Sequence, residues 1–236
     1  MKSIVTIQAR SGSTRLPNKM RMQLGSDTVL SWVIKRASRS KEADLVVVAL
    51  PDTAENDDLE NMALGLGCQV YRGSEKDVLE RLTLSVRKHQ PDIVVRLCAD
   101  RPLVDPDVLD DTVRIFNDYY KTNQPLDLAF SHQAGQGADW PYGFGVEVLS
   151  YPCLEWINKT VTNPLEREHV TLHLWNHSVR YKIKPLPCPS AYSMHGPNSK
   201  FDLDTSTDLT RLQRLITSPE DITLPGHEFV SRAVSL

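Results

Sequence analysis

Short apolar runs alternate with helical apolar spacings along the first half of the chain. Runs that are β-branched or continuously apolar predict strands over residues 4–7, 45–49, 69–71 and 93–98. Between them, apolar residues fall three and four positions apart, which predicts amphipathic helices over residues 30–37, 57–66, 78–86 and 108–119. The repeated order is therefore strand, helix, strand.

Local signals mark two of the helix ends. Gly67 is placed to end the second helix, and Asp105 followed by Pro106 is an N-cap with proline at the first helical position. Strand–helix alternation predicts an α/β, Rossmann-like three-layer fold with a mostly parallel central sheet. Ligands of such sheets bind outside the carboxyl ends of the strands, so the loops after Ile7, Ala49 and Cys98 are the ones to examine.

The second half of the chain has a different pattern. Proline and glycine become denser over residues 135–145, strands are predicted over 144–149 and 180–185, and a helix over 165–175. Thr205 or Ser206 caps a last clear helix. No linker divides the chain, so we predict one domain over residues 1–236, in which 135–190 form a small inserted α+β region for dimerisation and acceptor binding.

Composition limits the class of protein. The 236 residues are 40% apolar with a net charge of −3, which excludes a disordered chain and a small disulfide scaffold and argues against a nucleic-acid partner. No apolar run approaches the ~18 residues of a membrane span, and no signal peptide pattern is present. We therefore expect a cytoplasmic protein without membrane contact. The four cysteines contain no CxxC pair and are expected to be thiols.

The loop after the first strand carries most of the chemistry. It holds three cations (Arg10, Arg15, Lys19), one glycine (Gly12) and three hydroxyl residues within ten positions. Small residues let backbone N–H groups approach phosphate oxygens, and the cations neutralise the phosphate charge. The Walker and dinucleotide glycine patterns are absent. A solvated basic loop is the alternative, but this position favours a nucleotide triphosphate.

Two acidic positions complete the candidate site. Asp100 lies at the carboxyl end of a predicted buried strand, where a carboxylate facing phosphates suits Mg²⁺. Asp202 and Asp204 lie in a second acidic segment and share one face only if the backbone is extended. Each acid alone also fits a helix cap or a surface turn. Beside the basic loop, they indicate a nucleotide–metal site.

Three residues near position 170 allow a second interpretation. His169 and His173 are four positions apart on a predicted helix, and Glu166 precedes His169 by three, which would suit a zinc-binding face. The HExxH pattern is absent and no cysteine lies near in the sequence. A structural or substrate-contacting role is therefore favoured over zinc.

Five motifs in order carry a family resemblance. They are QARxxSTRLPxK (residues 8–19), RGSxxDVLxR (72–81), VRLxxDxPLxDP (95–106), REHVT (167–171) and DTxxDL (204–209). The chain resembles the cytidylyltransferase-like family of spore-coat polysaccharide synthesis. That family is similar to the acylneuraminate and 3-deoxy-manno-octulosonate cytidylyltransferases. The match runs over about residues 4–215.

The resemblance implies a fold, ligands and site residues. It implies a nucleotide-diphospho-sugar transferase-like fold, CTP and an acidic sugar as substrates, Mg²⁺ as cofactor and a homodimer. Asp100 and Asp204 would hold the metal, and catalysis would fall to Arg10, Arg15, Lys19 and Asp100. The nucleotide would contact Gln8, Ala9, Arg10, Ser11, Gly12, Ser13, Arg15, Lys19, Arg72, Ser74 and Asp100; the acceptor would contact Glu147, Arg167, Glu168 and His169.

The chain also departs from the family's pattern. Arg101 stands where the family usually has cysteine or glutamate, and Tyr142–Glu147 lacks two acids of the family's pattern. These differences bear on the acceptor sugar and on turnover. The predicted reaction is activation of an acidic sugar by CTP, giving a CMP-sugar and pyrophosphate for surface polysaccharide synthesis. The alternatives are a nucleotide-sugar glycosyltransferase and a non-catalytic nucleotide-binding relative.

Overall fold

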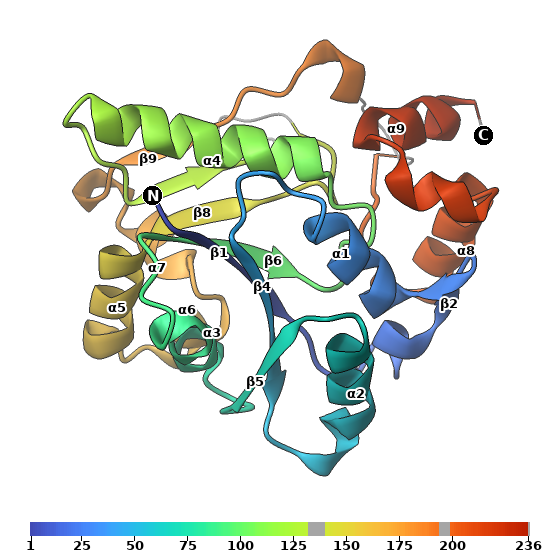
Figure 1. Ribbon diagram of the computed structural model, residues 1–236, viewed down its shortest axis with the longest axis horizontal. Helices are drawn as coiled ribbons and strands as arrows, with labels where there is room; N and C mark the ends of the chain where they lie inside the picture. Colours follow the sequence, from blue (N-terminus) through green and yellow to red (C-terminus); the bar gives the residue numbers. More distant parts are fainter. Residues whose placement is uncertain (132–139, 194–198, 236) are drawn as a thin grey trace.

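A seven-stranded sheet runs through the middle of the molecule (Figure 1). The computed structural model describes residues 1–131, 140–193 and 199–235. The strand order is β5-β4-β1-β6-β8-β7-β9, and only β8 runs against the other strands of this sheet. The strands are β1 (Ser3–Gln8), β4 (Leu45–Pro51), β5 (Gln69–Gly73), β6 (Ile93–Cys98), β7 (Leu128–Phe130), β8 (Glu147–Ser150) and β9 (Ile183–Pro185). The predicted mostly parallel α/β sheet is confirmed.

Helices cover both faces of the sheet. The helices α1 (Val29–Ala37), α2 (Asp57–Gly65) and α4 (Pro106–Lys121) pack on one face with the C-terminal helices α8 (Ser206–Leu215) and α9 (Gly226–Val234). The opposite face is covered by α3 (Val78–Arg87), α5 (Tyr151–Thr160) and α7 (Leu172–Asn176). A two-stranded ribbon, β2 (Gln23–Leu24) with β3 (Asp27–Thr28), leads into α1.

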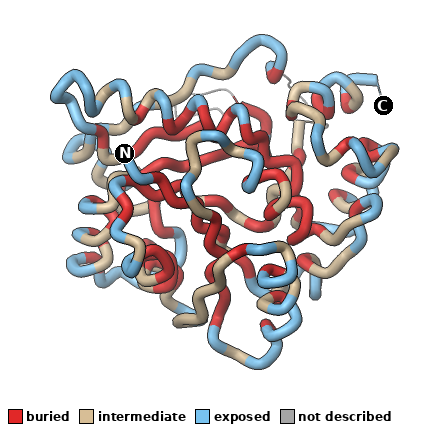
Figure 2. Tube along the Cα trace, in the orientation of Figure 1, coloured by how far each residue is buried: buried red, intermediate tan, exposed pale blue. Residues whose placement is uncertain are grey.

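The period of two along each strand divides the core between these faces. In β1, Val5 and Ile7 join the cluster under α1 and α4, whereas Ile4 joins the cluster under α3 and α5. The neighbouring strands contribute in the same way, so the central strands are buried on both sides (Figure 2). This explains why their sequences are continuously apolar rather than alternating.

A buried arginine ties the C-terminal segment to the sheet. Arg36 is fully buried, and its guanidinium donates to the carbonyls of Val104, Ile222 and Leu224 at 2.7–3.0 Å. Burial lowers the pKa of Arg36 to about 10. These bonds hold the chain after α8 against the loop after β6, so the C-terminal part of the molecule is fixed relative to the sheet.

Several predicted elements differ from those observed. The helix expected over 165–175 is two short helices, α6 (Pro164–Glu168) and α7, because Val170 between them has φ of 51°. The expected strands 144–149 and 180–185 are shorter and begin at Glu147 and Ile183. The sequence prediction missed α5, α9 and β7. Part of the expected insertion 135–190, residues 135–139, lies outside the described residues.

The two expected helix caps are confirmed by the described residues. Thr205 caps α8 through a reciprocal bond pair with Asp208, and Asp105 caps α4 before Pro106. All four cysteines are free thiols. Within residues 1–131, 140–193 and 199–235, no helix has the length and apolar character to cross a membrane. The described part of the chain also contains short 3₁₀ helices at Lys19–Arg21, Ala54–Asn56, Ser178–Arg180, Ser190–Tyr192 and Pro219–Thr223.

Candidate active site

A polar cleft lies at the carboxyl ends of β1 and β6. Its volume is about 230 Å³, and its lining includes five cationic side chains and three carboxylates. This is the edge of the sheet at which ligands bind in open α/β folds. The lining residues are Gln8, Ala9, Arg10, Gly12, Ser13, Thr14, Arg15, Lys19, Met20, Val78, Arg81, Arg96, Cys98, Ala99, Asp100, Glu168, His169 and Asp204.

Lys19 brings two distant carboxylates together. It opens a 3₁₀ turn after Asn18, whose φ of 58° lets the loop reverse toward the sheet. Lys19 Nζ lies 3.1 Å from Asp100 Oδ2 and 3.5 Å from Asp204 Oδ1, and it donates to the carbonyl of Leu203 at 2.9 Å. Two acids separated by about a hundred residues of chain therefore converge on one cation.

Hydrogen bonds from the backbone hold the second acid in place. The Leu203 amide donates to the carbonyl of Asp100 at 2.8 Å, which joins the two acidic loops. Asp208, in the first turn of α8, accepts from the Asp204 amide at 3.0 Å and from Lys200 at 2.9 Å. Burial opposes ionisation of Asp208, but the bonds from Lys200, Thr205 and Asp204 outweigh it and lower its pKa. Asp204 thus rests on a rigid, ionised helix cap.

The opposite wall of the cleft carries two arginines. Arg81, on α3, is 2% exposed, and its Nη1 donates to the carbonyls of Ser74 and Glu75. Burial and then the charge of nearby Arg10 lower the pKa of Arg81 to about 10. Among the described residues, the Arg10 side chain forms no ion pair. Two neighbouring like charges on one wall favour an anionic ligand.

A buried ion pair forms the floor of the cleft. Arg96 projects from β6 and pairs with Glu147 on β8, and Thr171 donates to the other oxygen of Glu147 at 2.7 Å. Gln8 accepts from Arg96 Nε at 3.0 Å. Burial alone would lower the pKa of Arg96, but the Glu147 carboxylate outweighs it and raises that pKa. Arg96 therefore stays charged at the base of the cleft.

The cleft gathers most residues that the sequence assigned to it. The predicted nucleotide, metal and catalytic residues that line it are Gln8, Ala9, Arg10, Gly12, Ser13, Arg15, Lys19, Asp100 and Asp204. Of the predicted acceptor residues, Glu168 and His169 line it from the end of α6. Arg15 is 67% exposed and pairs with Asp204 at 2.9 Å.

Five predicted residues lie outside this lining. Ser11 is buried beneath the loop, where its amide donates to Asn56 at 2.8 Å. Ser74 caps the turn before α3 by accepting from Asp77 at 3.1 Å. Glu147 lies under the floor, where it pairs with Arg96. The two remaining residues are held by acids.

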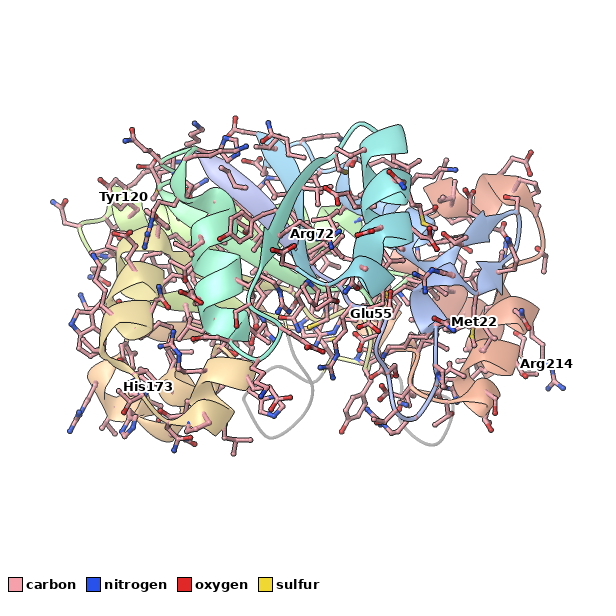
Figure 3. The ribbon with its side chains drawn as sticks, turned by 90° about the horizontal axis from the view of Figure 1, so that it is seen from below. Met22, Glu55, Arg72, Tyr120, His173 and Arg214 are labelled. Carbon is pink, nitrogen blue, oxygen red and sulfur yellow. The ribbon has the colours of Figure 1, made fainter. Side chains whose placement is uncertain are left out.

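Those two residues are Arg72 and Arg167. Arg72 lies on β5 (Figure 3). It pairs with Glu60 at 2.7 Å and Asp57 at 3.0 Å. Arg167 pairs with Asp77 at 2.7 Å and donates to the carbonyl of Val161, also at 2.7 Å. Their assigned contacts with nucleotide and acceptor stay predictions.

Comparison with known proteins identifies the family. The model of the cytidylyltransferase family matches residues 4–218. This chain is a cytidylyltransferase family member. The spore coat polysaccharide biosynthesis protein SpsF of Bacillus subtilis is 31% identical over 225 residues, which cover 89% of this chain and 84% of that protein. The family and this relative make the chain a nucleotidyltransferase, as the sequence predicted.

Solved structures agree with the fold. A cytidylyltransferase from Leptospira borgpetersenii is 27% identical, with a TM-score of 0.87, and the similarity covers 100% of this chain and 94% of that one. The CMP:2-keto-3-deoxy-manno-octonic acid synthetase, solved with CTP, is 18% identical with a TM-score of 0.68, covering 91% and 98%. The nucleotide-diphospho-sugar transferase-like fold is therefore confirmed.

Two of the positions where this cytidylyltransferase departs from its family's pattern, Arg101 and Gly145, contact each other. Arg101 Nη1 donates to the carbonyl of Gly145. A Cβ built on Gly145 would lie 2.7 Å from Arg101 Nη1, closer than side chains pack. A side chain at position 145 would therefore have to displace the Arg101 guanidinium, so the residues at 101 and 145 depend on each other. The two candidate metal-binding acids, Asp100 and Asp204, are retained in the sequence.

Sequence reasoning assigned no role to Arg81 or Arg96. Arg96 is the one charge in the apolar run 93–98. A charge in a buried strand needs a partner or a function, so this position indicates a site residue. Arg81 closes the RGSxxDVLxR motif of the family, yet helical periodicity alone treats it as a surface position. Its burial against the carbonyls of Ser74 and Glu75 depends on tertiary structure.

Proposed function

We propose that this cytidylyltransferase activates an acidic sugar with CTP to give a CMP-sugar and pyrophosphate for surface polysaccharide synthesis. The observation that carries the proposal is the convergence of Asp100 and Asp204 on Lys19 inside a cleft that is otherwise rich in cations. A triphosphate with a divalent cation needs this combination of acids and bases. The acidic sugar is suggested by relatives named for CMP-activated sugar acids.

Mg²⁺ fits the acidic side of the cleft. Asp100 and Asp204 already direct one oxygen each toward a single cation, Lys19 Nζ, at 3.1 and 3.5 Å. Mg²⁺ uses one or two carboxylates together with substrate phosphates and water. When bound, it would polarise the α-phosphate and orient the leaving group. Asp100 and Asp204 are the residues that would hold it.

The cationic residues would neutralise the leaving group. A hydroxyl oxygen of the sugar acid attacks the α-phosphorus of CTP and loses its proton to water, and the bond from that phosphorus to the bridging oxygen breaks as pyrophosphate departs. Arg10, Arg15 and Lys19 line the loop where that charge would develop. Fixed positive charge of this kind accounts for much of the rate in phosphoryl transfer. This displacement requires no covalent enzyme intermediate.

The acceptor would bind beside α6. Glu168 and His169 line that end of the cleft, and Arg96 offers positive charge at its floor. A sugar carboxylate pairs well with an arginine. We further propose a cytoplasmic enzyme that forms a homodimer through the region 135–190, the dimer being suggested by family resemblance alone.

Product analysis tests this function. The wild-type protein is incubated with CTP, Mg²⁺ and each member of a panel of nonulosonic and octulosonic acids, and pyrophosphate and CMP-sugar are measured together. We expect both products in equal amounts with one class of acid. Consumption of a nucleotide-sugar instead would indicate a glycosyltransferase. CTP binding without product across the panel would indicate a non-catalytic relative.

A further inference from the structure

A cluster of metal-binding side chains lies outside the cleft, where α6 meets α7. Glu166 on α6, His173 on α7 and His177 at its end each direct one ligand atom into a common space, and these three atoms lie within 4.8 Å of one another. Glu166 is buried, whereas His177 is partly exposed. Figure 3 shows His173 in this helical segment, apart from Arg72 and Glu55.

The local geometry directs both imidazoles at one carboxylate. His173 Nδ1 lies 2.7 Å from Glu166 Oε2, and His177 Nε2 lies 3.9 Å from Glu166 Oε1. The two rings are four positions apart, so one helical turn brings their centroids to 4.5 Å, with the ring planes tilted by 50°. The break at Val170 makes this possible, because it turns α7 back so that its histidines face α6.

The carboxylate is oriented and ionised. Asn176 donates to Glu166 Oε1 at 2.8 Å, as outer-shell groups do for metal-binding carboxylates. The bond from Asn176 and then the bond from His173 lower the pKa of Glu166 against the opposing effect of burial. The rings of Trp156 and Tyr181 lie 6.3 and 5.9 Å from that of His173 and border the cluster on one side.

We propose that Glu166, His173 and His177 bind a divalent transition metal of the zinc type. Two imidazoles and one carboxylate are a common zinc donor set that leaves a fourth position for water. Imidazole ligands favour Zn²⁺, Ni²⁺ and Cu²⁺, whereas Mg²⁺ prefers oxygen. Zinc bonds of about 2.0–2.2 Å place ligand atoms about 3.4 Å apart, so a small rotation of the exposed His177 completes the site.

A metal here would fix one wall of the cleft. It would join α6 to α7 and so hold the turn between them, which carries His169 into the cleft and Thr171 onto Glu147. The metal site is therefore separate from the reacting groups, but it would stabilise the segment that carries Glu168 and His169 into the cleft. The sequence suggested His169 and His173 as the two histidines of a zinc site. In the structure, the two histidines that lie together with Glu166 are His173 and His177.

Cobalt spectroscopy tests the site directly. Co²⁺ is titrated into the metal-free full-length protein, and its visible absorption reports the number and geometry of its ligands. We expect one equivalent with the intense spectrum of a four-coordinate site, displaced by Zn²⁺. Because the Asp100–Asp204 pair also attracts divalent cations, the titration is repeated with Asp100→Asn, which should leave this spectrum unchanged.

One ligand variant and a matched control test the assignment of the ligands. His177→Ala removes a partly exposed ligand with little risk to folding, and should weaken Co²⁺ binding at least tenfold. His227→Ala, on α9, is the matched control, because its side chain is as exposed as that of His177 (40% against 39%), and it should bind like the wild type. The proposal is overturned if His177→Ala binds Co²⁺ as tightly as the wild type, or if the only spectrum is octahedral and disappears in Asp100→Asn.

Hydrogen exchange supplies a second readout. Zn²⁺ should slow amide exchange across α6 and α7 in the wild type and in His227→Ala, but not in His177→Ala. Equal protection in all three proteins would contradict the assignment to this cluster.

Discussion

Arg10, in the loop after β1, and Arg72, on the edge strand β5, have opposite electrostatic surroundings. Arg10 lines the cleft and forms no ion pair with the described residues, and its charge lies close enough to Arg81 to affect that residue's pKa. Arg72, on β5, is surrounded by the carboxylates of Glu60, Asp57 and Asp52 at 2.7, 3.0 and 3.6 Å. The sequence assigned both arginines to the nucleotide.

The comparison separates binding charge from structural charge. Arg72 would have to give up its carboxylate partners to bind a phosphate, so it would contribute little net affinity. Arg15 and Lys19 also pair with carboxylates, but those carboxylates belong to Asp100 and Asp204, which Mg²⁺ would bind instead. A cation left without partners beside another cation gains much more from an anionic ligand. We therefore expect loss of activity from changes at the cleft and loss of stability from changes at buried or edge pairs.

The largest effect is expected at the metal-binding acids. Asp100→Asn removes the charge that would hold Mg²⁺ and should lower kcat/KM by about 10³-fold or more, with an unchanged melting temperature. Asp118→Asn, an exposed carboxylate on α4, is the matched control and should keep wild-type kinetics. Near-native turnover of Asp100→Asn in saturating Mg²⁺ would remove Asp100 from the site.

The next largest effect is expected on stability, beneath the cleft. Glu147→Ala leaves the Arg96 charge buried and unpaired, and should lower the free energy of unfolding by about 3–5 kcal/mol. Glu155→Ala removes a carboxylate that pairs at the surface with Arg87, and should cost less than about 1 kcal/mol. Urea unfolding measures both. A Glu147→Ala loss as small as that of Glu155→Ala would mean that Arg96 is solvated.

Arg10 supplies the sharpest test of a partnerless charge. Arg10→Ala should lower kcat/KM by about 10²-fold, since one fixed donor to developing charge is worth about 2.7 kcal/mol or more. Its melting temperature should not fall, because no ion pair with residues 1–131, 140–193 or 199–235 is lost. A stability loss without a kinetic one would reverse the assignment.

The smallest effect is expected at the edge strand. Arg72→Ala should lower the free energy of unfolding by about 1–2 kcal/mol, because its partners are partly exposed and solvent screens the pairs. CTP affinity should change by less than the tenfold that about 1.4 kcal/mol represents. A larger loss of affinity would place Arg72 at the nucleotide, as the sequence resemblance implies.

Much of the fold was predictable where one local signal dominated. The strand at 93–98 follows from its apolar run, and α4 follows from Asp105 and Pro106. The break at Val170 was not, since nothing local favours a positive φ at a β-branched residue. Tertiary packing against β8 and α3 decides that turn, and with it which histidines meet.

The site was predictable to the same degree. The basic loop and Asp100 follow from their places after β1 and β6, because parallel strands bring those loops to one edge. Asp204 needed the family motif. The sequence could not show that Arg72 is paired with carboxylates whereas Arg10 is available for a ligand. The carboxylates that neutralise Arg72 lie on α2 and the loop before it, and only the fold brings them close.

Thermal unfolding with CTP, UTP, ATP and GTP, each with and without Mg²⁺, tests the central claim most directly. A ligand at 100 times its Kd adds about 2.7 kcal/mol, which for a chain of this size raises the melting temperature by about 5–10 °C. Among the four nucleotides, we predict this shift only for CTP. The shift should be larger with Mg²⁺ than without it, and Asp100→Asn should remove the Mg²⁺ effect. The absence of a shift with every nucleotide would contradict a nucleotide site in this cleft.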